Sequence, residues 1–551
     1  MTAPLTALST AATTAYPLPA GSVPAARTTV AAAAEPASGL VPSLVQSVDW
    51  LAIAPVVITA AVALAVLVAD LFVPERRKPL LGWISVAGLA AATAALLPLR
   101  AGDRATFCLT GDPAATATAA ATACSYTADH FALVVQFLVL AGALVTALLS
   151  VTAVRETRMP AGEYWFLLLA SAAGAALLPA ARDLATLIVA LEVASLPAFA
   201  LVGMRRGDRL SSEAALKFFL SSVTATAVSL LGVSFVYATT GSLHLGRVAD
   251  GLENVPGQFT TLAMAGVALT LVGFAFKTAA VPFHFWVPDT YVGAPLPVAG
   301  YLSVIGKAVG FTGLVLVTVI AFPAYAQIWG PALAVLAALT MTLGNAAALR
   351  QSPDRPNSAV RLLAWSSVGQ AGYLLVPIAA AAYAGRDQIG STVAYALMYA
   401  VVNLGAFAVA ALVARTKPLH RISDYRGLYA ERPLAALALA FFLLCLAGLP
   451  PGIIGLFAKV TVFRSAVEAG LGWLAVLMAV NVVIALYYYL RWTALLFRAP
   501  EPEAGDAAPP ARTKAPWPVT AAITLTAALA VALSGAPELV LRFASGSLFP
   551  Q

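Results

Sequence analysis

The amino-acid sequence predicts an all-α polytopic membrane protein of about fourteen transmembrane helices, two of them broken. Of its 551 residues, 61% are hydrophobic and 10% are charged, whereas a soluble domain is typically about 45–50% apolar and about 25% charged. A chain this apolar cannot cover itself with polar surface, which excludes a soluble enzyme. Since about 20 apolar residues cross a bilayer, the length allows at most roughly fifteen spans.

The first 48 residues differ in composition from everything that follows. Residues 1–48 are rich in alanine, threonine and proline and hold a single basic residue, Arg27. A signal peptide needs a basic start followed by an apolar core, and this segment shows neither. We expect residues 1–48 to form a poorly ordered extension, residues 49–535 the transmembrane domain, and residues 536–551 a short tail.

From Asp49 onward, apolar runs of spanning length follow one another, separated by short polar loops. A run of about 20 apolar residues is long enough for a helix to cross the hydrocarbon core. The pattern predicts spans at 50–73, 79–98, 129–153, 162–180, 184–204, 212–238, 259–290, 297–320, 330–349, 361–384, 388–414, 433–468, 471–497 and 516–535.

The seventh and twelfth runs are too long for one straight crossing, and both contain proline. Val281-Pro282 interrupts the seventh, and Pro450-Pro451-Gly452 interrupts the twelfth. Because proline removes a backbone donor and clashes with the preceding turn, we expect both helices to be broken. Broken helices at membrane depth persist only where they are packed in protein or line a polar cavity.

Basic residues are distributed unevenly between the two sets of loops. One set holds 19 lysine and arginine side chains and the other holds 7. Since cytoplasmic loops carry the excess of lysine and arginine, the first set is predicted to be cytoplasmic, which places both termini on the outer side. The net charge of +7 thus reflects membrane topology and gives no reason to expect nucleic-acid binding.

The three cysteines do not form a metal or redox motif. Cys108 and Cys124 fall together in the outer loop 99–128, where an oxidising compartment would permit a disulfide, although two free thiols remain the alternative. Cys445 lies in the twelfth run and is expected to be a small packing residue. The sequence has no C-x-x-C pair and no glycine-rich phosphate loop, so it offers no visible site for a nucleotide, haem, cluster or zinc.

Five charged residues lie within apolar runs, where on insertion scales a central charge costs ~2.5–3.5 kcal/mol. Burial favours the neutral form of a lysine, while a neighbouring carboxylate favours the charged form. A lysine between these influences can accept and release a proton as its partner moves, so a chain of such groups can act as a proton relay. The five candidates are Glu192, Lys217, Lys277, Lys307 and Lys459.

Each of these charges also has a purely structural interpretation. Lys217 could extend to the cytoplasmic interface, and the others could form static ion pairs. Two more polar residues, His284 and Asp289, follow the first break and could join the relay or lie in an interfacial loop. Because five charges occur together, two of them beside the helix breaks, the sequence favours a relay.

Several stretches resemble the antiporter-like subunits of respiratory complex I. The most specific is FKTAAVPFHFWVPDTYVGAPLPV at 276–298, and its PD-x-Y-x-GAP element is similar to the subunit N branch of bacterial NADH:quinone oxidoreductases. Subunits M and L and the Mrp-type cation/proton antiporters usually continue differently. The resemblance extends over roughly residues 50–535 and includes LEVASLPAFALVG, EAALKFFLSS, RLLAWSSVGQAGYLL and LAGLPPGIIGLFAKV.

This resemblance implies a fold and a role for each candidate residue. The family fold has fourteen helices with two inverted five-helix repeats, each holding a broken helix. Glu192, Lys217 and Lys277 would form a coupled charge group, Lys307 would be the central relay, and Lys459 would lead towards the outer exit. Gln370 stands where the family often carries a relay histidine; since glutamine cannot titrate, it would position water there or the path would differ.

The resemblance also implies partners and cofactors that lie outside this chain. Its partners would be other membrane subunits of complex I, chiefly neighbouring antiporter-like and small subunits, together with membrane lipids in a bacterial cell membrane. NADH, FMN, iron–sulfur clusters and quinone would reside in other subunits, and the alanine-rich composition, typical of a high-GC bacterium, suggests menaquinone. A cation/proton antiporter subunit of an Mrp-type complex is the alternative function.

Overall fold

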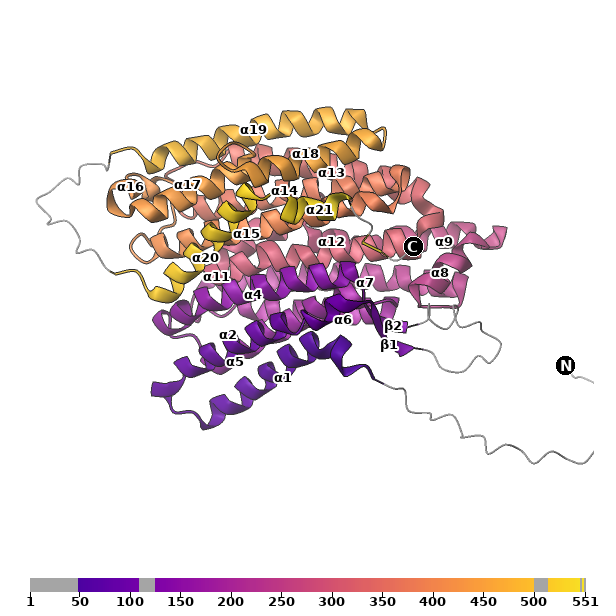
Figure 1. Ribbon diagram of the computed structural model, residues 1–551, viewed down its shortest axis with the longest axis horizontal. Helices are drawn as coiled ribbons and strands as arrows, with labels where there is room; N and C mark the ends of the chain where they lie inside the picture. The colour runs from indigo at the N-terminus through magenta and orange to yellow at the C-terminus, as the bar shows by residue number, and fades with distance from the viewer. Residues whose placement is uncertain (1–47, 109–123, 500–513, 546–547, 550–551) are drawn as a thin grey trace, which may run out of the picture. The chain divides into compact units, whose positions relative to one another are not determined.

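The computed structural model shows a predominantly helical transmembrane architecture (Figure 1). It describes residues 48–108, 124–499, 514–545 and 548–549, so the predicted extension lies almost wholly outside the described residues. In the described part, thirteen helices are long and apolar enough to cross a membrane. The shorter α17 (Pro433–Ala447) continues after a break as α18 (Ile453–Glu468) and supplies a fourteenth crossing, which confirms the predicted number of spans.

Three crossings and a hairpin precede the first of two five-helix sets. The crossings are α1 (Trp50–Phe72), α2 (Pro79–Ala94) and α4 (His130–Glu156), and the hairpin between α2 and α4 consists of β1 (Arg104–Cys108) and β2 (Cys124–Ala128). The first set comprises α5 (Ala161–Leu177), α6 (Leu184–Val202), α7 (Arg209–Thr240), α9 (Thr260–Thr278) with α10 (Trp286–Gly293), and α11 (Leu296–Tyr301) with α12 (Lys307–Val315).

The second set repeats this order with the opposite direction of crossing. It comprises α13 (Ala326–Leu349), α14 (Ser358–Ala384), α15 (Ile389–Ala414), α17 with α18, and α19 (Gly472–Leu496). In both sets the fourth crossing is the broken one. Because five crossings are an odd number, the second set starts from the face of the helix array opposite to the first. The two sets therefore have the inverted relationship that the family resemblance implied.

Four shorter or later helices complete the described chain. The last crossing is α20 (Trp517–Gly535), and α21 (Glu538–Ser545) follows it within the predicted tail. The amphipathic α8 (Leu245–Glu253) lies at the same end of the helices as the β-hairpin, whereas α16 (Leu428–Glu431) lies at the other end (Figure 1). The sequence analysis predicted none of α8, α16, α21 and the hairpin, since all are too short or too polar to read as spans.

Aspartates begin several of the crossings. The carboxylates of Asp49, Asp129, Asp183 and Asp208 accept hydrogen bonds from backbone N–H groups in the first turns of α1, α4, α6 and α7, respectively. Such N-caps satisfy backbone donors that the helix itself leaves unpaired. The polar residues that punctuate the apolar runs therefore fix where these helices start, which is why the predicted boundaries agree with the structure to within a few residues.

Both predicted breaks are present. The C-cap residues that follow α9 and α17 are Ala279 and Gly448, and both have the left-handed conformation, with φ of 69° and 83°. The peptide bonds Val281–Pro282 and Pro450–Pro451, which follow, are cis. A left-handed C-cap stops a helix because its N–H turns back to earlier carbonyls, so the chain leaves each helix axis before the proline and resumes a helix beyond it.

The hairpin holds the two paired cysteines. Cys108 of β1 lies opposite Cys124 of β2 in the antiparallel register, and the structure joins them in a disulfide. The segment between them, 109–123, lies outside the described residues. Arg182, in the loop before α6, binds the hairpin through its backbone N–H, which donates to the Ser125 carbonyl of β2 at 2.9 Å, and its guanidinium forms an ion pair with Asp129 at the start of α4.

The crossings differ in how deeply they are buried in the protein. Within the most hydrophobic window of each span, 94% of α14 and 83% of both α15 and the α11–α12 segment are buried, against 33% of α1 and 39% of α7, α19 and α20. Helices α11–α12, α14 and α15 therefore form the interior, and α1, α7, α19 and α20 present large apolar faces outward. A side chain on the interior helices meets protein rather than lipid.

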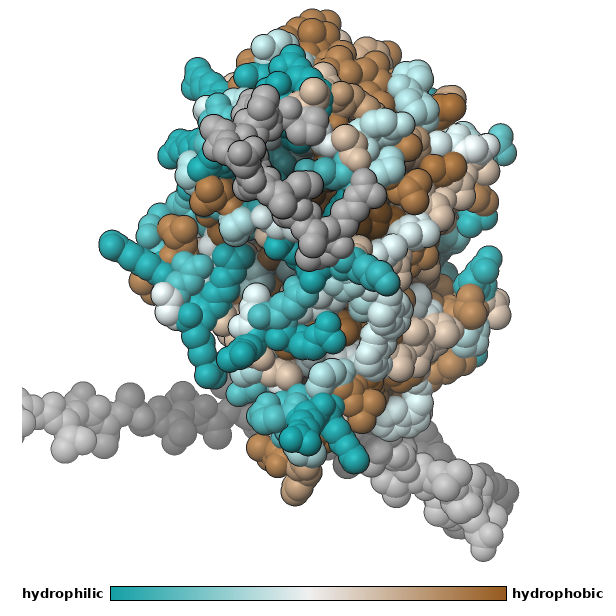
Figure 2. Space-filling view, turned by 90° about the vertical axis from the view of Figure 1, so that its left-hand side faces the viewer, coloured by the Kyte–Doolittle hydropathy of each residue, from teal (hydrophilic) through white to brown (hydrophobic). Residues whose placement is uncertain are grey.

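The face that carries most of the basic loops is hydrophilic (Figure 2). Figure 2 looks onto the end of the helices at which α16 lies, and polar surface predominates there between patches of apolar side chains. The loop arginines exposed at this end include Arg76, Arg77, Arg155, Arg158, Arg206, Arg350 and Arg355.

Candidate functional site

Lys277 lies in the last turn of α9, immediately before the first break. Its side chain is 4% exposed, and within the described residues no hydrogen bond or ion pair engages its ammonium group. Instead, Nζ lies over three phenylalanine rings, 4.9 Å from the centroid of Phe199, 4.8 Å from that of Phe218 and 5.9 Å from that of Phe276. A lysine before a helix break, as predicted, is thus held in an aromatic environment.

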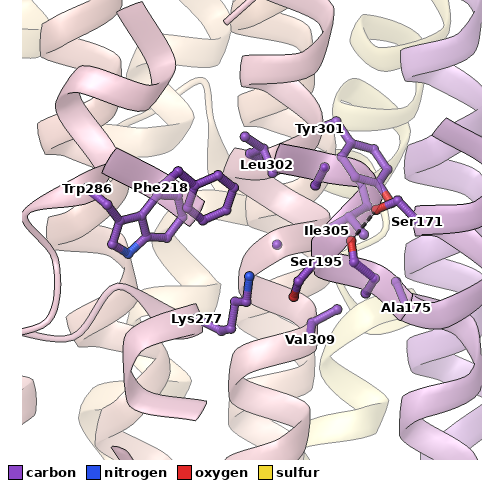
Figure 3. Close-up of a pocket in the computed structure, with 13 residues that line it drawn as sticks. Ser171, Ala175, Ser195, Phe218, Lys277, Trp286, Tyr301, Leu302, Ile305 and Val309 are labelled. Carbon is purple, nitrogen blue, oxygen red and sulfur yellow. Dashed lines mark hydrogen bonds between the residues drawn. The ribbon is translucent and has the colours of Figure 1, made fainter. Parts of the chain in front are cut away.

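A cavity adjoins Lys277 (Figure 3). Its polar lining consists of Lys277 and the hydroxyls of Ser171, Ser195 and Tyr301, of which Tyr301 donates to Ser171 at 2.9 Å. The space suffices for about one water molecule. The cavity therefore has room for a water molecule beside the ammonium group.

Glu192 is the carboxylate that the sequence analysis grouped with Lys277. It lies on α6, is half-buried, and its Oε1 accepts a hydrogen bond of 2.7 Å from the hydroxyl of Thr226 on α7. No direct ion pair joins Glu192 to Lys277 in the described chain, so the two charges interact through space while each keeps its own local partner. This arrangement leaves both groups free to exchange partners.

Lys217 lies apart from Glu192 and Lys277. Its Nζ lies 2.7 Å from Glu213, four residues earlier on α7, and 2.9 Å from Asp289 on α10. The expectation that Lys217 joins Glu192 in one charge group does not match this geometry. Thr226, which bonds Glu192, is nine residues beyond Lys217, or about 14 Å along the helix axis.

The partners of Lys217 form a charged cluster at the basic end of the helices. Asp289 also lies 3.4 Å from Arg361 of α14. The side chains of Lys217, Glu213 and Asp289 are 40–48% exposed in the isolated chain. The sequence analysis left Asp289 open and did not connect Glu213 to Lys217. The i,i+4 spacing of Glu213 and Lys217, which places both on one helix face, was the available signal.

Lys307 is the most deeply buried of the lysines. It is 1% exposed, and its Nζ has no hydrogen-bond partner among the described residues. A π-helical segment, Leu302–Gly306, directly precedes it, and such segments often occur at functional sites. Gly310, one turn further on, lies so close to Lys277 and Thr278 that a Cβ there would come within 2.3 Å of the Thr278 nitrogen. This glycine lets α12 pack directly on the end of α9.

Lys459 lies beyond the second break and its side chain binds back to the helix that precedes the break. It lies on α18, is 6% exposed, and its Nζ donates to the carbonyls of Leu446 and Ala447 at 2.8 Å each. These carbonyls belong to the last turn of α17, where a helix leaves acceptors unsatisfied and carries a partial negative charge. Lys459 therefore holds together the two halves of the broken helix.

Gln370 lies on α14 and contacts the end of α17 at the second break. Its Nε2 donates to Leu446 O at 3.5 Å and to the hydroxyl of Tyr489 at 3.2 Å, and its Oε1 accepts from Tyr395. The predicted relay position thus holds an amide whose donors and acceptor are engaged.

His284 is half-buried. Its ring packs against that of Trp365 with 5.6 Å between the ring centroids, and its Nδ1 has no hydrogen-bond partner in the described chain.

Hydroxyl and amide groups that sequence reasoning missed lie in the interior between Lys307 and Gln370. Asn403 donates to Ser303 at 2.6 Å, and the hydroxyl of Tyr399 lies 2.8 Å from that of Ser367. The Ser366 hydroxyl lies 2.5 Å from that of Tyr489. Four of these residues, Ser366, Ser367, Tyr399 and Asn403, lie in α14 and α15, whose apolar runs make polar side chains conspicuous, and that was the available signal. They form a polar seam through the interior helices.

Two broken crossings in inverted sets, with a buried lysine at each break, define an antiporter-like membrane transport subunit. The sequence profile described as NADH:quinone oxidoreductase/Mrp antiporter, TM, matches residues 181–485, which include all five candidate charges. The chain belongs to this family, in the branch of the NADH-quinone oxidoreductase subunits N.

Individual relatives agree with this placement. The chain is 75% identical to NADH-quinone oxidoreductase subunit N 2 of Streptomyces griseus subsp. griseus, over 92% of its own length and 95% of the relative. It is 46% identical to subunit N of Salinispora tropica, over 84% and 87%, respectively.

Solved structures show the same fold. A chain of respiratory complex I from Thermus thermophilus with bound aureothin matches with a TM-score of 0.69 at 32% identity, covering 90% of this chain and 100% of that one. A chain of the Mrp complex from Dietzia sp. DQ12-45-1b matches with a TM-score of 0.75 at 20% identity, covering 90% and 96%. The second likeness concerns the fold alone.

Proposed function

We propose that this chain is a proton-translocating membrane subunit of a bacterial NADH:quinone oxidoreductase and that its buried charges form the proton path. The observation that carries the proposal is the placement of Lys277, Lys307 and Lys459, which are all almost completely buried and carry no carboxylate partner in direct contact within the described chain. A static structural role would call for such a partner, because an unpaired buried charge is costly.

The proposed path begins at the charged cluster of Glu213, Lys217 and Asp289. This cluster lies at the basic end of the helices, which we take as the cytoplasmic side with both termini outside. From there the path passes Glu192 and Lys277, then Lys307, and follows the polar seam to Gln370 and Lys459. Gln370 cannot carry a proton itself, so its role is to position Tyr395, Tyr489 and water along the step.

The redox reaction would take place elsewhere in the complex. The proposal assigns NADH, FMN, the iron–sulfur clusters and the quinone, menaquinone in a high-GC bacterium, to partner subunits. The neighbouring antiporter-like and small membrane subunits would contact this chain within the cell membrane. The charged cluster of Glu213, Lys217 and Asp289 supports such a contact, since its side chains are 40–48% exposed in the isolated chain and offer charges that a polar partner surface could pair.

The direct test is Lys307→Ala in the assembled complex, with Lys417→Ala as the matched control because Lys417 lies in the loop after α15. Proton pumping and NADH oxidation would be measured together in membrane vesicles. We expect Lys307→Ala to abolish most pumping and the control to leave it unchanged. Normal pumping by a normally assembled Lys307→Ala complex would refute the relay.

An Mrp-type cation/proton antiporter subunit would use the same helices, but the sequence argues against it. The identity to subunits N is 75% and 46%, against 20% for the Mrp chain, and the PD-x-Y-x-GAP element is typical of subunit N. Co-purification separates the two functions. Flavin and iron–sulfur subunits among the partners would support the proposal, and small membrane subunits alone would support the antiporter.

A further inference from the structure

Three phenylalanines from three different helices surround the ammonium group of Lys277. Phe199 comes from α6, Phe218 from α7 and Phe276 from α9, and all three ring centroids lie within 5.9 Å of Nζ. A cation within about 6 Å of an aromatic face is attracted to the negative potential of the ring. Since no hydrogen-bond acceptor among the described residues contacts Nζ, the rings are the described groups that stabilise the charge.

A tryptophan beyond the helix break packs against two of the three rings, those of Phe218 and Phe276. Trp286, the first residue of α10, stacks on Phe218 with centroids 4.4 Å apart and an interplanar angle of 12°. It also stacks on Phe276 at 5.5 Å, and its Nε1 donates to the Phe276 carbonyl at 3.2 Å. Phe199 meets Phe218 edge-on at 4.6 Å. Figure 3 shows Phe218 and Trp286 side by side, facing the region of Lys277.

Adjacent residues of α7 therefore contact α10 in two different ways. Lys217 forms its ion pair with Asp289, and Phe218 stacks on Trp286, three residues earlier in α10. Any displacement of α10 relative to α7 must change both contacts. The charged cluster at the basic end and the rings around Lys277 are thus mechanically connected through one short helix.

We propose that Phe199, Phe218 and Phe276 form a cation–π cage that retains the protonated Lys277 between transfers, and that Phe218 is the positioning residue that connects this cage to α10. The inference rests on the proposed relay role of Lys277. Inside the cage the proton has no acceptor, so it leaves only when Lys277 turns to Glu192 or to water in the adjoining cavity. Displacement of α10 would remove the support of Phe218 and release the lysine.

Charged groups on the helices around Lys277 also influence how proton pumping depends on pH. They are Glu192 on α6, Glu213 and Lys217 on α7, Asp289 on α10 and Lys307 on α12. The polar groups that α5 and α11 present to the cavity are the hydroxyls of Ser171 and Tyr301. Because none of these groups changes when the ring of Phe218 is modified, a shift in the pH profile on such modification would report the ring itself.

The decisive experiment replaces Phe218 by phenylalanines with one, two and three ring fluorines in the intact complex. Fluorine withdraws electron density from the ring face and weakens cation–π attraction while the side chain keeps its shape. We expect the alkaline limb of proton pumping to move to lower pH with each fluorine, by about half a pH unit over the series. The matched control is the same series at Phe274, a buried residue of α9 that lies outside the three-ring cage.

A second measurement tests the cage without relying on pumping. Thermal unfolding of the purified complex would be compared for Phe218→Leu, Lys277→Met and the double variant. The cage predicts that the two effects on the melting temperature are not additive, because the double variant loses one shared interaction. Additive melting shifts together with a flat fluorine series would overturn the inference.

The two measurements also separate this inference from the proposed function. If Lys277→Met pumps normally, the relay role of Lys277 is wrong, and non-additive melting would still support the cage as a structural feature. If Lys277→Met stops pumping while fluorination at Phe218 acts no differently from fluorination at Phe274, the relay stands and the role of Phe218 is refuted.

Discussion

Gln370 and Lys459 donate to the same carbonyl oxygen, that of Leu446 in the last turn before the second break, at 3.5 Å and 2.8 Å. The glutamine comes from α14 and the lysine from α18, so one backbone acceptor joins two helices that are distant in sequence. The amide that replaces a titratable group in the sequence therefore shares a backbone acceptor with the terminal lysine of the proposed path.

This arrangement predicts that Gln370→Leu slows pumping several-fold. The change removes a donor to Tyr489 and an acceptor for Tyr395, and unsatisfied buried polar groups cost about 1–3 kcal/mol each. Gln370→His, which restores a titratable group, should keep pumping near the wild-type rate. Proton pumping relative to NADH oxidation in vesicles checks both. A Gln370→Leu complex that pumps normally would show that the amide is not part of the path.

Lys459 has both a structural and a proposed chemical role, and two substitutions separate them. Lys459→Met removes the donor to the Ala447 carbonyl, so we expect less assembled complex. Lys459→Arg keeps a permanent charge beside α17 but cannot lose its proton. That variant should assemble at near-normal levels and still lose most of its pumping. Equal pumping by the arginine variant and the wild type would contradict a relay through Lys459.

Much of the fold could be predicted because the membrane restricts it strongly. Hydropathy located the crossings, and proline located both breaks at Val281-Pro282 and Pro450-Pro451. Any backbone that crosses lipid must satisfy its own hydrogen bonds. The hairpin and α8 escaped prediction because they lie outside the apolar runs, where that restriction does not apply.

The candidate site was predictable residue by residue but not in its pairing. Their position within apolar runs singled out Lys277, Lys307 and Lys459, and the structure shows all three buried. Which carboxylate faces Lys217 depends on how α7 and α10 pack, and the sequence gives no distance between them. The phenylalanines around Lys277 were not identifiable either, because phenylalanine is ordinary in an apolar helix and becomes notable only through its position.

His420, in the loop between α15 and α17, predicts a loss of stability in acid. Burial, and then the nearby Arg205 guanidinium, lower the pKa of His420 below its ordinary value of about 6.5, and Asp424 opposes this only in part. The unfolded chain therefore binds a proton at a higher pH than the folded chain does. As the pH falls below about 6.5, folding should become less favourable until the folded-state pKa is reached.

Replacement of His420 by asparagine should remove this contribution. Asparagine tolerates the positive φ of 49° at this position, and the backbone bond from Ala359 to the residue 420 carbonyl can persist. The melting temperature of the purified complex, followed from pH 7.5 down to about 5.5, should fall less steeply for His420→Asn than for the wild type. Parallel curves would mean that other groups dominate the acid response.

The cysteines of the hairpin give a test of the orientation. With both termini outside, Cys108 and Cys124 face the outer compartment, whereas Cys445 is fully buried in α17. A membrane-impermeant maleimide added to intact cells should label Cys108 and Cys124 only after reduction of their disulfide, and should not label Cys445. The variant with Cys108→Ser and Cys124→Ser is the control and should remain unlabelled. Labelling without prior reduction would show free thiols, and labelling that needs inverted vesicles would reverse the proposed topology.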